Sequence, residues 1–235
     1  MYYELKKATY DANIAVKKAG LVLFTWGNVS VKDEALKAVA IKPSGVPYDS
    51  LLIDDIVVVD FNGNILEGEL NPSVDLPTHL AIYKVHPEIA SIVHTHSTYA
   101  TAWAQKGRAI PMYGTTHADY FSEDIPCAAH PNKYEINEYE KVTGVILAKT
   151  IKSGHANECP AALIKGHGAF AWGKNADDAV YHAIVLEEVA RMAFITEAIS
   201  GDNIPLASHI RLAHYSRKHG PNSTYGQKDP NKEEK

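Results

Sequence analysis

The chain has 235 residues, 46% hydrophobic and 22% charged, a balance typical of a globular protein and not of a disordered or fibrous one. A net charge of −5 argues against nucleic acid or an acidic membrane as the main partner, although a local positive site for an anionic substrate stays compatible with it. There is no membrane-spanning apolar run or signal peptide, and only Cys127 and Cys159 could pair, so we expect a cytoplasmic protein without a disulfide framework.

The first third of the chain is predicted to form one helix and several short strands. Apolar side chains recur at helical spacing over residues 2–19, and Gly20 is placed to end the helix. Strand-like runs follow at residues 29–31, 38–41 and 56–61. The sequence Asn62-Gly63-Asn64 then predicts a turn between two strands.

The rest of the chain mixes helices and strands. A helix is expected at residues 77–86, a buried strand at 89–95, the start of a helix at 98–104, strands at 161–165 and 169–172, and a long helix at 176–199 capped by Asn175. Because strict alternation of strand and helix is missing and several turns are short, a largely antiparallel or mixed α/β sheet is favoured over a doubly wound parallel one.

Two nearby histidines carry the strongest local signal for a metal. In IVHTH, residues 92–96, His94 and His96 are two positions apart on a strand, so their side chains point to the same face. His167 lies between Gly166 and Gly168, which allow a sharp turn and a close approach to the ring. Three imidazoles with an open position suit catalytic Zn²⁺, whereas the alternative is polar residues at a strand end and on a hairpin.

Asp75 stands just before Pro77 and a predicted helix, and two interpretations remain open for it. The carboxylate could cap that helix, or it could be a fourth metal ligand or an acid/base beside the metal. Asp119, within the polar run TTHADY, is similarly a candidate proton carrier, although a loop aspartate often only stabilises its own turn.

Two glycine-containing segments could receive an anion. In KPSG, residues 42–45, Lys42 supplies charge while the turn can direct backbone N–H groups at a phosphate. In WGNVS, residues 26–30, glycine permits close approach and Asn28 offers an amide. Each motif is also explained as an ordinary turn.

Together these segments resemble the class II aldolase/adducin-head family, and most closely its branch of L-ribulose-5-phosphate 4-epimerases. The resemblance covers residues 5–227, and its motifs are FTWGNVS (24–30), IKPSGV (41–46), DLPTH (75–79), IVHTHS (92–97), GTTHADYF (114–121), GAFAWGKN (168–175), RKHG (217–220) and YGQ (225–227). The TTHADY run and the terminal tyrosine point to the epimerase branch, and the histidines are shared by the wider family.

The resemblance implies a three-layer α/β/α fold with a central, mainly antiparallel sheet, formed by a single domain over residues 1–227 and followed by a disordered tail at 228–235. It implies a homotetramer with one Zn²⁺ per subunit, and a small sugar phosphate as the partner. The implied metal site consists of His94, His96 and His167, with Asp75 at or beside the metal. The implied substrate and phosphate site consists of Gly27, Asn28, Lys42, Ser44, Gly45, Ser73, Val74 and Asp75.

The resemblance also implies proton transfer by Asp119 and by Tyr225, which reaches the site of a neighbouring subunit. The branch commonly reads Pro-Ser-Ser-Asp where this chain has Val74 in place of the second serine, so one hydroxyl contact near the phosphate is missing. The roles of Glu140, His214 and Arg217 and the metabolic pathway stay open.

The implied reaction interconverts L-ribulose 5-phosphate and D-xylulose 5-phosphate. The hydrogen on C4 is β to the C2 carbonyl and is not acidic, so zinc-assisted cleavage and re-formation of C3–C4 is the easier route. The first alternative is an aldolase for fuculose or rhamnulose 1-phosphate, although such aldolases tend to carry Glu near the Asp75 position. The second is a non-catalytic interaction module, as the adducin head shows this fold can be.

Overall fold

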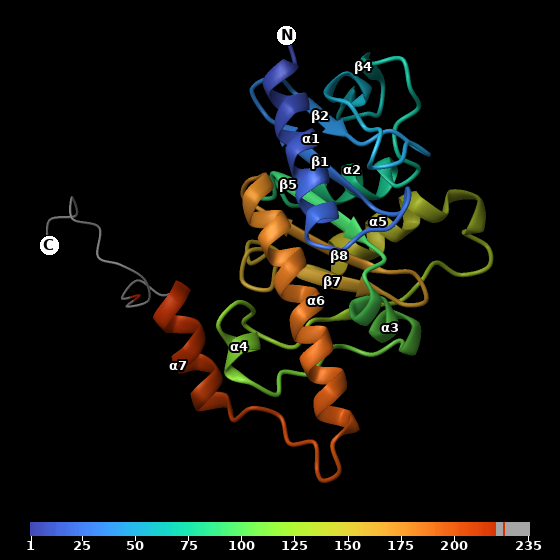
Figure 1. Ribbon diagram of the computed structural model, residues 1–235. Helices are drawn as coiled ribbons and strands as arrows, with labels where there is room; N and C mark the ends of the chain where they lie inside the picture. Colours follow the sequence, from blue (N-terminus) through green and yellow to red (C-terminus); the bar gives the residue numbers. More distant parts are fainter. Residues whose placement is uncertain (220–222, 224–235) are drawn as a thin grey trace, which may run out of the picture.

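The protein is described by a computed structural model over residues 1–219 and 223, so Tyr225 and the predicted tail at 228–235 lie outside the described residues. Within them, one sheet has the strand order β4-β3-β2-β1-β5-β8-β7-β6 (Figure 1). The strands are β1 (Asn28–Asp33), β2 (Ala38–Ile41), β3 (Val57–Asp60), β4 (Ile65–Glu67), β5 (Ser91–Thr95), β6 (Cys127–Ala128), β7 (Ala161–Ile164) and β8 (Ala169–Gly173). Among these neighbours β6 and β7 pair parallel and all others antiparallel, which confirms the mainly antiparallel sheet.

Helices cover both faces of this sheet and make the three predicted layers (Figure 1). One face carries α1 (Tyr3–Lys18), α3 (Thr98–Lys106) and α6 (Ala176–Ala198), and the other carries α2 (Leu76–Val85) and α5 (Tyr139–Thr150). The short helix α4 (Thr115–Ala118) packs against α7 (Ser208–His219), and two 3-10 turns complete the set, η1 (Ile53–Asp55) and η2 (Ile136–Glu138). The helices of the described residues include none with the length and hydropathy of a membrane span.

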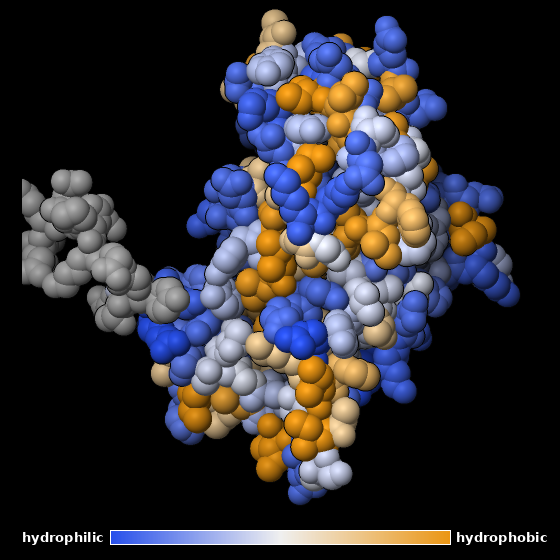
Figure 2. Space-filling model, viewed as in Figure 1, coloured by the Kyte–Doolittle hydropathy of each residue, from blue (hydrophilic) through white to orange (hydrophobic). Residues whose placement is uncertain are grey.

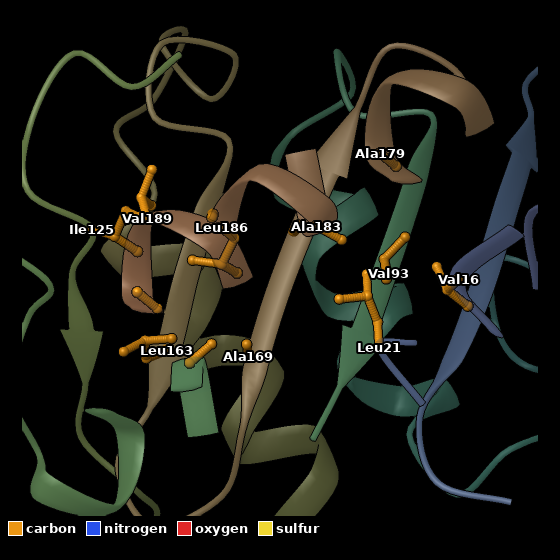
Figure 3. Packing of buried hydrophobic residues seen from close by; sticks show 14 of the residues in the cluster. Val16, Leu21, Val93, Ile125, Leu163, Ala169, Ala179, Ala183, Leu186 and Val189 are labelled. Carbon is orange, nitrogen blue, oxygen red and sulfur yellow. The ribbon is translucent and has the colours of Figure 1, made fainter. Parts of the chain in front are cut away.

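Strand β5 shows how the sheet separates core from site. Val93 points into the apolar layer under α1 and α6, where Figure 3 shows it with Leu186 of α6 and Leu163 of β7. Ile92 belongs to the second apolar cluster, beneath α2 and α5. Because side chains alternate along a strand, His94 shares the face of Ile92 and its ring lies over Phe170 of that same cluster. The histidine is therefore held by a packed core on the α2–α5 side.

Most of the predicted elements are confirmed within one or two residues at each end, and both cysteines are free. Three helices were not predicted, namely α4, α5 and α7. Helix α5 contains Gly144 at its centre, where a Cβ atom would lie 2.7 Å from the Cβ of Ala81, so the glycine is what lets α5 approach α2. Helix α7 holds His214 and Arg217, whose roles were left open, and both side chains bind the Asp119 carboxylate.

Candidate active site with a histidine cluster

The three predicted histidines meet at one place, where β5 ends beside the turn between β7 and β8. Their nearest ring nitrogens all lie within 4.8 Å of one another, and the Nε2 atoms of His94 and His96 are 3.2 Å apart. His167 arrives from the turn, and its ring centroid is 4.8 Å from that of His94 and 5.1 Å from that of His96. The strand spacing therefore predicts two of these positions, and the pairing of β5 with β8 supplies the third.

Further hydrogen bonds fix which ring nitrogen faces the cluster. His94 Nδ1 lies 3.0 Å from the carbonyl oxygen of Ala169, to which it donates, so its Nε2 lone pair is directed into the cavity. His167 Nδ1 is 3.4 Å from the hydroxyl of Tyr139. Such partners for the second nitrogen are what metal-binding histidines usually have.

The electrostatics favour neutral, metal-binding imidazoles. Burial lowers the pKa of His94 and of His96, and it lowers the pKa of His167 to about 4, with His94 as the next cause. At neutral pH each ring therefore keeps a lone pair for a metal without first releasing a proton. Three neutral imidazoles and an adjacent carboxylate are a donor set that fits a divalent ion of the zinc type.

Asp75 is the adjacent carboxylate. It occupies the N-cap position of α2, but its side chain makes no capping hydrogen bond. Instead its Oδ2 accepts a hydrogen bond from Asn28 Nδ2 at 2.7 Å and lies 3.9 Å from His94 Nε2. Burial opposes ionisation, yet His94, His79 and His167 in their protonated forms and the hydrogen bond from Asn28 together lower the pKa of Asp75. The carboxylate thus faces the histidine cluster in its ionised form.

A cavity of about 390 Å³ extends from the histidines to the predicted anion-binding turns. Two loops form its far end side by side: Ser44 N donates to the carbonyl of Asn71 at 2.9 Å, and Ser73 N donates to the carbonyl of Lys42 at 3.1 Å. Asn28 also donates to Ser73 Oγ at 3.0 Å, which joins this end to the metal end. The predicted residues that line the cavity are Gly27, Asn28, Lys42, Ser44, Gly45, Ser73, Val74, Asp75, His94, His96 and His167.

Gly27 has a specific steric role in this wall. Its φ is +73°, and a Cβ atom there would lie 2.5 Å from the carbonyl oxygen of His94. No other residue could bring the backbone so close to β5, so this glycine sets the position of Asn28 opposite Asp75.

Asp119 does not line this cavity, and Tyr225 lies outside the described residues. Asp119 lies at the end of α4, where its carboxylate accepts hydrogen bonds from Arg217 and from His214 Nδ1, each at 3.0 Å. Burial would raise the pKa of Asp119, but these hydrogen bonds outweigh it and hold the pKa below its usual range. No residue of α4 or α7 lines the cavity within the described part of the chain, and Tyr225 lies outside that part.

Several other residues of the cavity wall have no role predicted from the sequence, which left that of Glu140 open. Tyr139 and Glu140 begin α5, and Trp26 lies at the rim with its ring centroid 6.4 Å from that of His96. Tyr139 and Glu140 have no local motif, and only the packing of α5 on α2 brings them here. Trp26 stands in the WGNVS motif, where the sequence predicts substrate contacts only for Gly27 and Asn28.

A second cavity, of about 480 Å³, lies between α6 and residues 111–117. Its lining includes one imidazole, that of His117, and one carboxylate, that of Asp202, among mainly apolar groups. It has neither a histidine cluster nor a lysine, so the cavity at His94 is the better candidate for catalysis although it is smaller.

The family described as Class II Aldolase and Adducin N-terminal domain matches residues 7–194. The chain belongs to this family. Proteins named L-ribulose-5-phosphate 4-epimerase UlaF, from Salmonella typhi and Salmonella paratyphi A, are 50% identical over 226 residues, which is 96% of this chain and 99% of theirs.

Solved structures of class II aldolase relatives agree with this fold. A structure named L-fuculose 1-phosphate aldolase superposes with a TM-score of 0.80 at 27% identity, covering 91% of this chain and 95% of that one. YgbL from Escherichia coli, a putative aldolase/epimerase/decarboxylase, superposes with a TM-score of 0.74 at 21% identity, covering 90% and 97%.

Proposed function

We propose that the chain is an L-ribulose-5-phosphate 4-epimerase that uses a zinc ion held by His94, His96 and His167, with Asp75 at or beside the metal. The observation that carries the proposal is the single cavity with neutral imidazoles at one end and a buried lysine and glycine turn at the other. The 50% identity to proteins named as that epimerase, over almost the whole of both chains, specifies the reaction.

The reaction proceeds by breaking and re-forming the C3–C4 bond. A base removes the proton of the C4 hydroxyl, C4 becomes the aldehyde carbon of glycolaldehyde phosphate, and the bonding electrons pass through C3 to the C2 carbonyl as an enediolate. A metal at the histidines supplies Lewis-acid stabilisation of negative charge on substrate oxygens. After the aldehyde rotates, C3 attacks its opposite face, and a second group returns a proton to the C4 oxygen.

The cavity residues of this chain hold the substrate during this exchange. The turn at Ser44 and Gly45, the hydroxyl of Ser73 and the Lys42 ammonium bind the phosphate, so the aldehyde fragment stays in the cavity while it rotates. Asn28 fixes the Asp75 carboxylate by its 2.7 Å hydrogen bond. Retention of both fragments is what makes the outcome an epimerisation and not a net cleavage.

Asp119 and Tyr225 are the proposed proton carriers, one for each face of the aldehyde. Asp119 is held as a carboxylate by Arg217, which suits a base. His219 Nε2 is 2.9 Å from the carbonyl oxygen of Asp119, and Tyr225 follows His219 by six positions in the sequence. This supports placing both carriers in one part of the molecule.

Because the described residues of α4 and α7 do not line the cavity of their own chain, we propose that a neighbouring subunit of a homotetramer supplies both carriers. Exposed apolar side chains along α6 support such contacts between copies, as Figure 2 shows on the face where α6 runs. They include Tyr181, Ile184, Phe194 and Ile195.

The direct test incubates the purified protein with L-ribulose 5-phosphate and measures D-xylulose 5-phosphate with and without a metal chelator. We expect epimerisation that stops with the chelator and returns with Zn²⁺. Release of free aldehyde without formation of the epimer would instead support the aldolase named among the structural relatives. An inactive protein without stoichiometric metal would support a non-catalytic module.

The acid/base assignment has its own test in Asp119→Asn and Tyr225→Phe. Each should lower kcat by about 10²–10⁴-fold, the usual contribution of a positioned proton carrier, while zinc remains bound. Lys7→Met is the control, because Lys7 pairs with Asp11 on the exposed face of α1, outside the cavity lining, and its loss should leave kcat unchanged. Full activity in both variants would eliminate the pair.

A further inference from the structure

Lys42 is a buried cation without an acidic partner. The residue is 1% exposed, and its Nζ donates to the carbonyl of Val46 at 2.6 Å and, less closely, to that of Pro43 at 3.3 Å. Among the described residues no carboxylate lies within ion-pair distance of it. Burial lowers the pKa of Lys42 to about 8. The two carbonyl oxygens and any other uncharged group near Nζ are therefore what offsets the cost of burying this charge.

The aromatic ring of Tyr48 occupies that position. Lys42 Nζ lies over the ring, 4.8 Å from its centroid, a separation suited to a cation–π interaction. Tyr48 is 3% exposed and packs in the apolar cluster with Val22 and Val29. Its hydroxyl has no hydrogen-bond partner among the described residues. What Tyr48 offers Lys42 is thus the face of its ring and not its hydroxyl.

The backbone of Tyr48 also reaches the second wall of the cavity. Its N–H donates to the carbonyl of Phe24 at 3.3 Å, in the loop that leads to Gly27 and Asn28. Phe24 has a φ of 53°, unusual for a residue other than glycine, so this loop is held in a conformation that needs support. Tyr48 consequently links the loop before Asn28 with the turn that contains Lys42.

We infer that Tyr48 is a positioning residue for phosphate recognition, whose ring face holds the Lys42 ammonium in place without neutralising it. A carboxylate in the same position would also stabilise the ammonium, but it would compete with the incoming phosphate for that charge. A ring stabilises the cation through its quadrupole and carries no net charge. The inference rests on the proposed function only in taking a phosphate as the group that Lys42 receives.

The test varies the ring electronics at constant shape and measures binding of inorganic phosphate to the metal-loaded protein by calorimetry. Tyr48→Phe keeps the ring and should bind phosphate within about twofold of wild type. Successive fluorination of that phenylalanine withdraws charge from the ring face and should weaken binding stepwise, up to about tenfold. These replacements barely change the volume, so folding is not at stake. Equal affinity throughout the fluorinated series would overturn the inference.

A double-mutant cycle with Lys42→Met separates positioning from a general structural role. In that background the fluorinated series should lose its effect, since the cation it acts on is gone. An undiminished effect without Lys42 would refute the inference. With L-ribulose 5-phosphate, the series should raise KM and leave kcat within about twofold.

Leu186→Ala, in the same apolar cluster but away from the cavity, is the stability control: it should lower the melting temperature without changing phosphate affinity. If phosphate binding depends on ring electronics but the protein does not epimerise the substrate, only the proposed reaction is refuted. If the protein epimerises the substrate but its phosphate affinity does not respond to changes at Tyr48, only the inference about Tyr48 is refuted.

Discussion

His94 and Asp119 are both proposed to act on one substrate, but their surroundings differ in burial, in partners and in place. His94 is 1% exposed, lies within the central sheet, and is kept neutral by burial. Asp119 directly follows the four-residue helix α4 and is kept charged by Arg217 and His214, which are at least 95 positions later in the chain. The histidine cluster is thus formed within one chain, whereas the proposed proton carrier Asp119 lies where α7 packs against α4.

This difference has a physical reason. A metal site needs fixed, neutral donors, and a strand inside a packed sheet supplies both rigidity and desolvation. A proton carrier needs an ionised carboxylate, which a polar surface with a guanidinium supplies at little cost. This contrast explains why metal binding and proton transfer can be placed on different parts of the fold. Four predictions test whether the two functions are separate.

The largest effect is expected for His94→Asn, which removes a buried imidazole donor. Loss of the metal should remove several kcal/mol of transition-state stabilisation, about a thousandfold in kcat. Metal content by mass spectrometry should fall with it. His155→Asn is the control, because His155 is an exposed residue paired with Glu158. Wild-type metal content in the His94 variant would contradict the proposed ligand set.

The separation of the two ends can be tested by co-expressing His94→Asn with Asp119→Asn. We assume that each site combines the histidines of one chain with Asp119 of its neighbour. In randomly mixed oligomers about half of the chains have an intact histidine cluster, and about half of their neighbours have Asp119. About 25% of the sites should therefore be restored. Each variant alone should stay inactive. Should the mixed oligomers show no recovery, Asp119 acts in its own chain or not at all.

A smaller effect is expected from Gly168→Ala beside the metal cluster. The added Cβ would lie 2.7 Å from the carbonyl of Thr95 and 3.2 Å from Cε1 of His94. Displacing the histidines should weaken metal affinity about 10–100-fold, the range found when support of a metal ligand is disturbed. Competition with a chromogenic chelator measures it.

Gly166 gives the matched control on the other side of His167. A Cβ there would meet nothing within 4 Å, but its φ of +72° makes alanine strained. Gly166→Ala should therefore lower the free energy of unfolding by about 1 kcal/mol and leave metal affinity near wild type. Equal metal affinities in the two variants would show that Gly168 does not shape the cluster.

The two ends also differ in what the sequence alone could predict. The pairing of His94 with His96 follows from the two-residue period of a strand, and Gly168 marks a close approach that the structure bears out. Lys42, Ser44 and Asn28 were found because anion-binding turns have a local composition. These signals depend on neighbours along the chain, which is why the cavity lining was largely predictable.

The other features depend on contacts between distant residues. The pairing of Asp119 with Arg217 spans 98 positions and leaves no local pattern. Tyr139 reaches the cavity only because Gly144 lets α5 approach α2, and sequence reasoning had no reason to expect that packing. Tyr48 was missed because a buried tyrosine without a hydrogen bond looks like any other core residue.

The smallest effect concerns pH and the phosphate end. Burial lowers the pKa of Lys42 to about 8, so the ammonium is lost as pH rises through that value. A phosphate monoester is already doubly ionised there, since its second pKa is about 6, and its own charge no longer changes. The value of kcat/KM for L-ribulose 5-phosphate should therefore be level near pH 7 and fall up to tenfold per pH unit well above pH 8.

Unphosphorylated L-ribulose separates Lys42 from the proton carriers. Poor as a substrate, it would still need the same acid and base but would not use the ammonium, so its kcat/KM should lack the fall near pH 8. Asp119, with its lowered pKa, stays ionised throughout this range and cannot cause the fall in kcat/KM above pH 8. If kcat/KM falls above pH 8 with both substrates, a proton carrier causes the fall. Lys42 would then stay charged over the whole range.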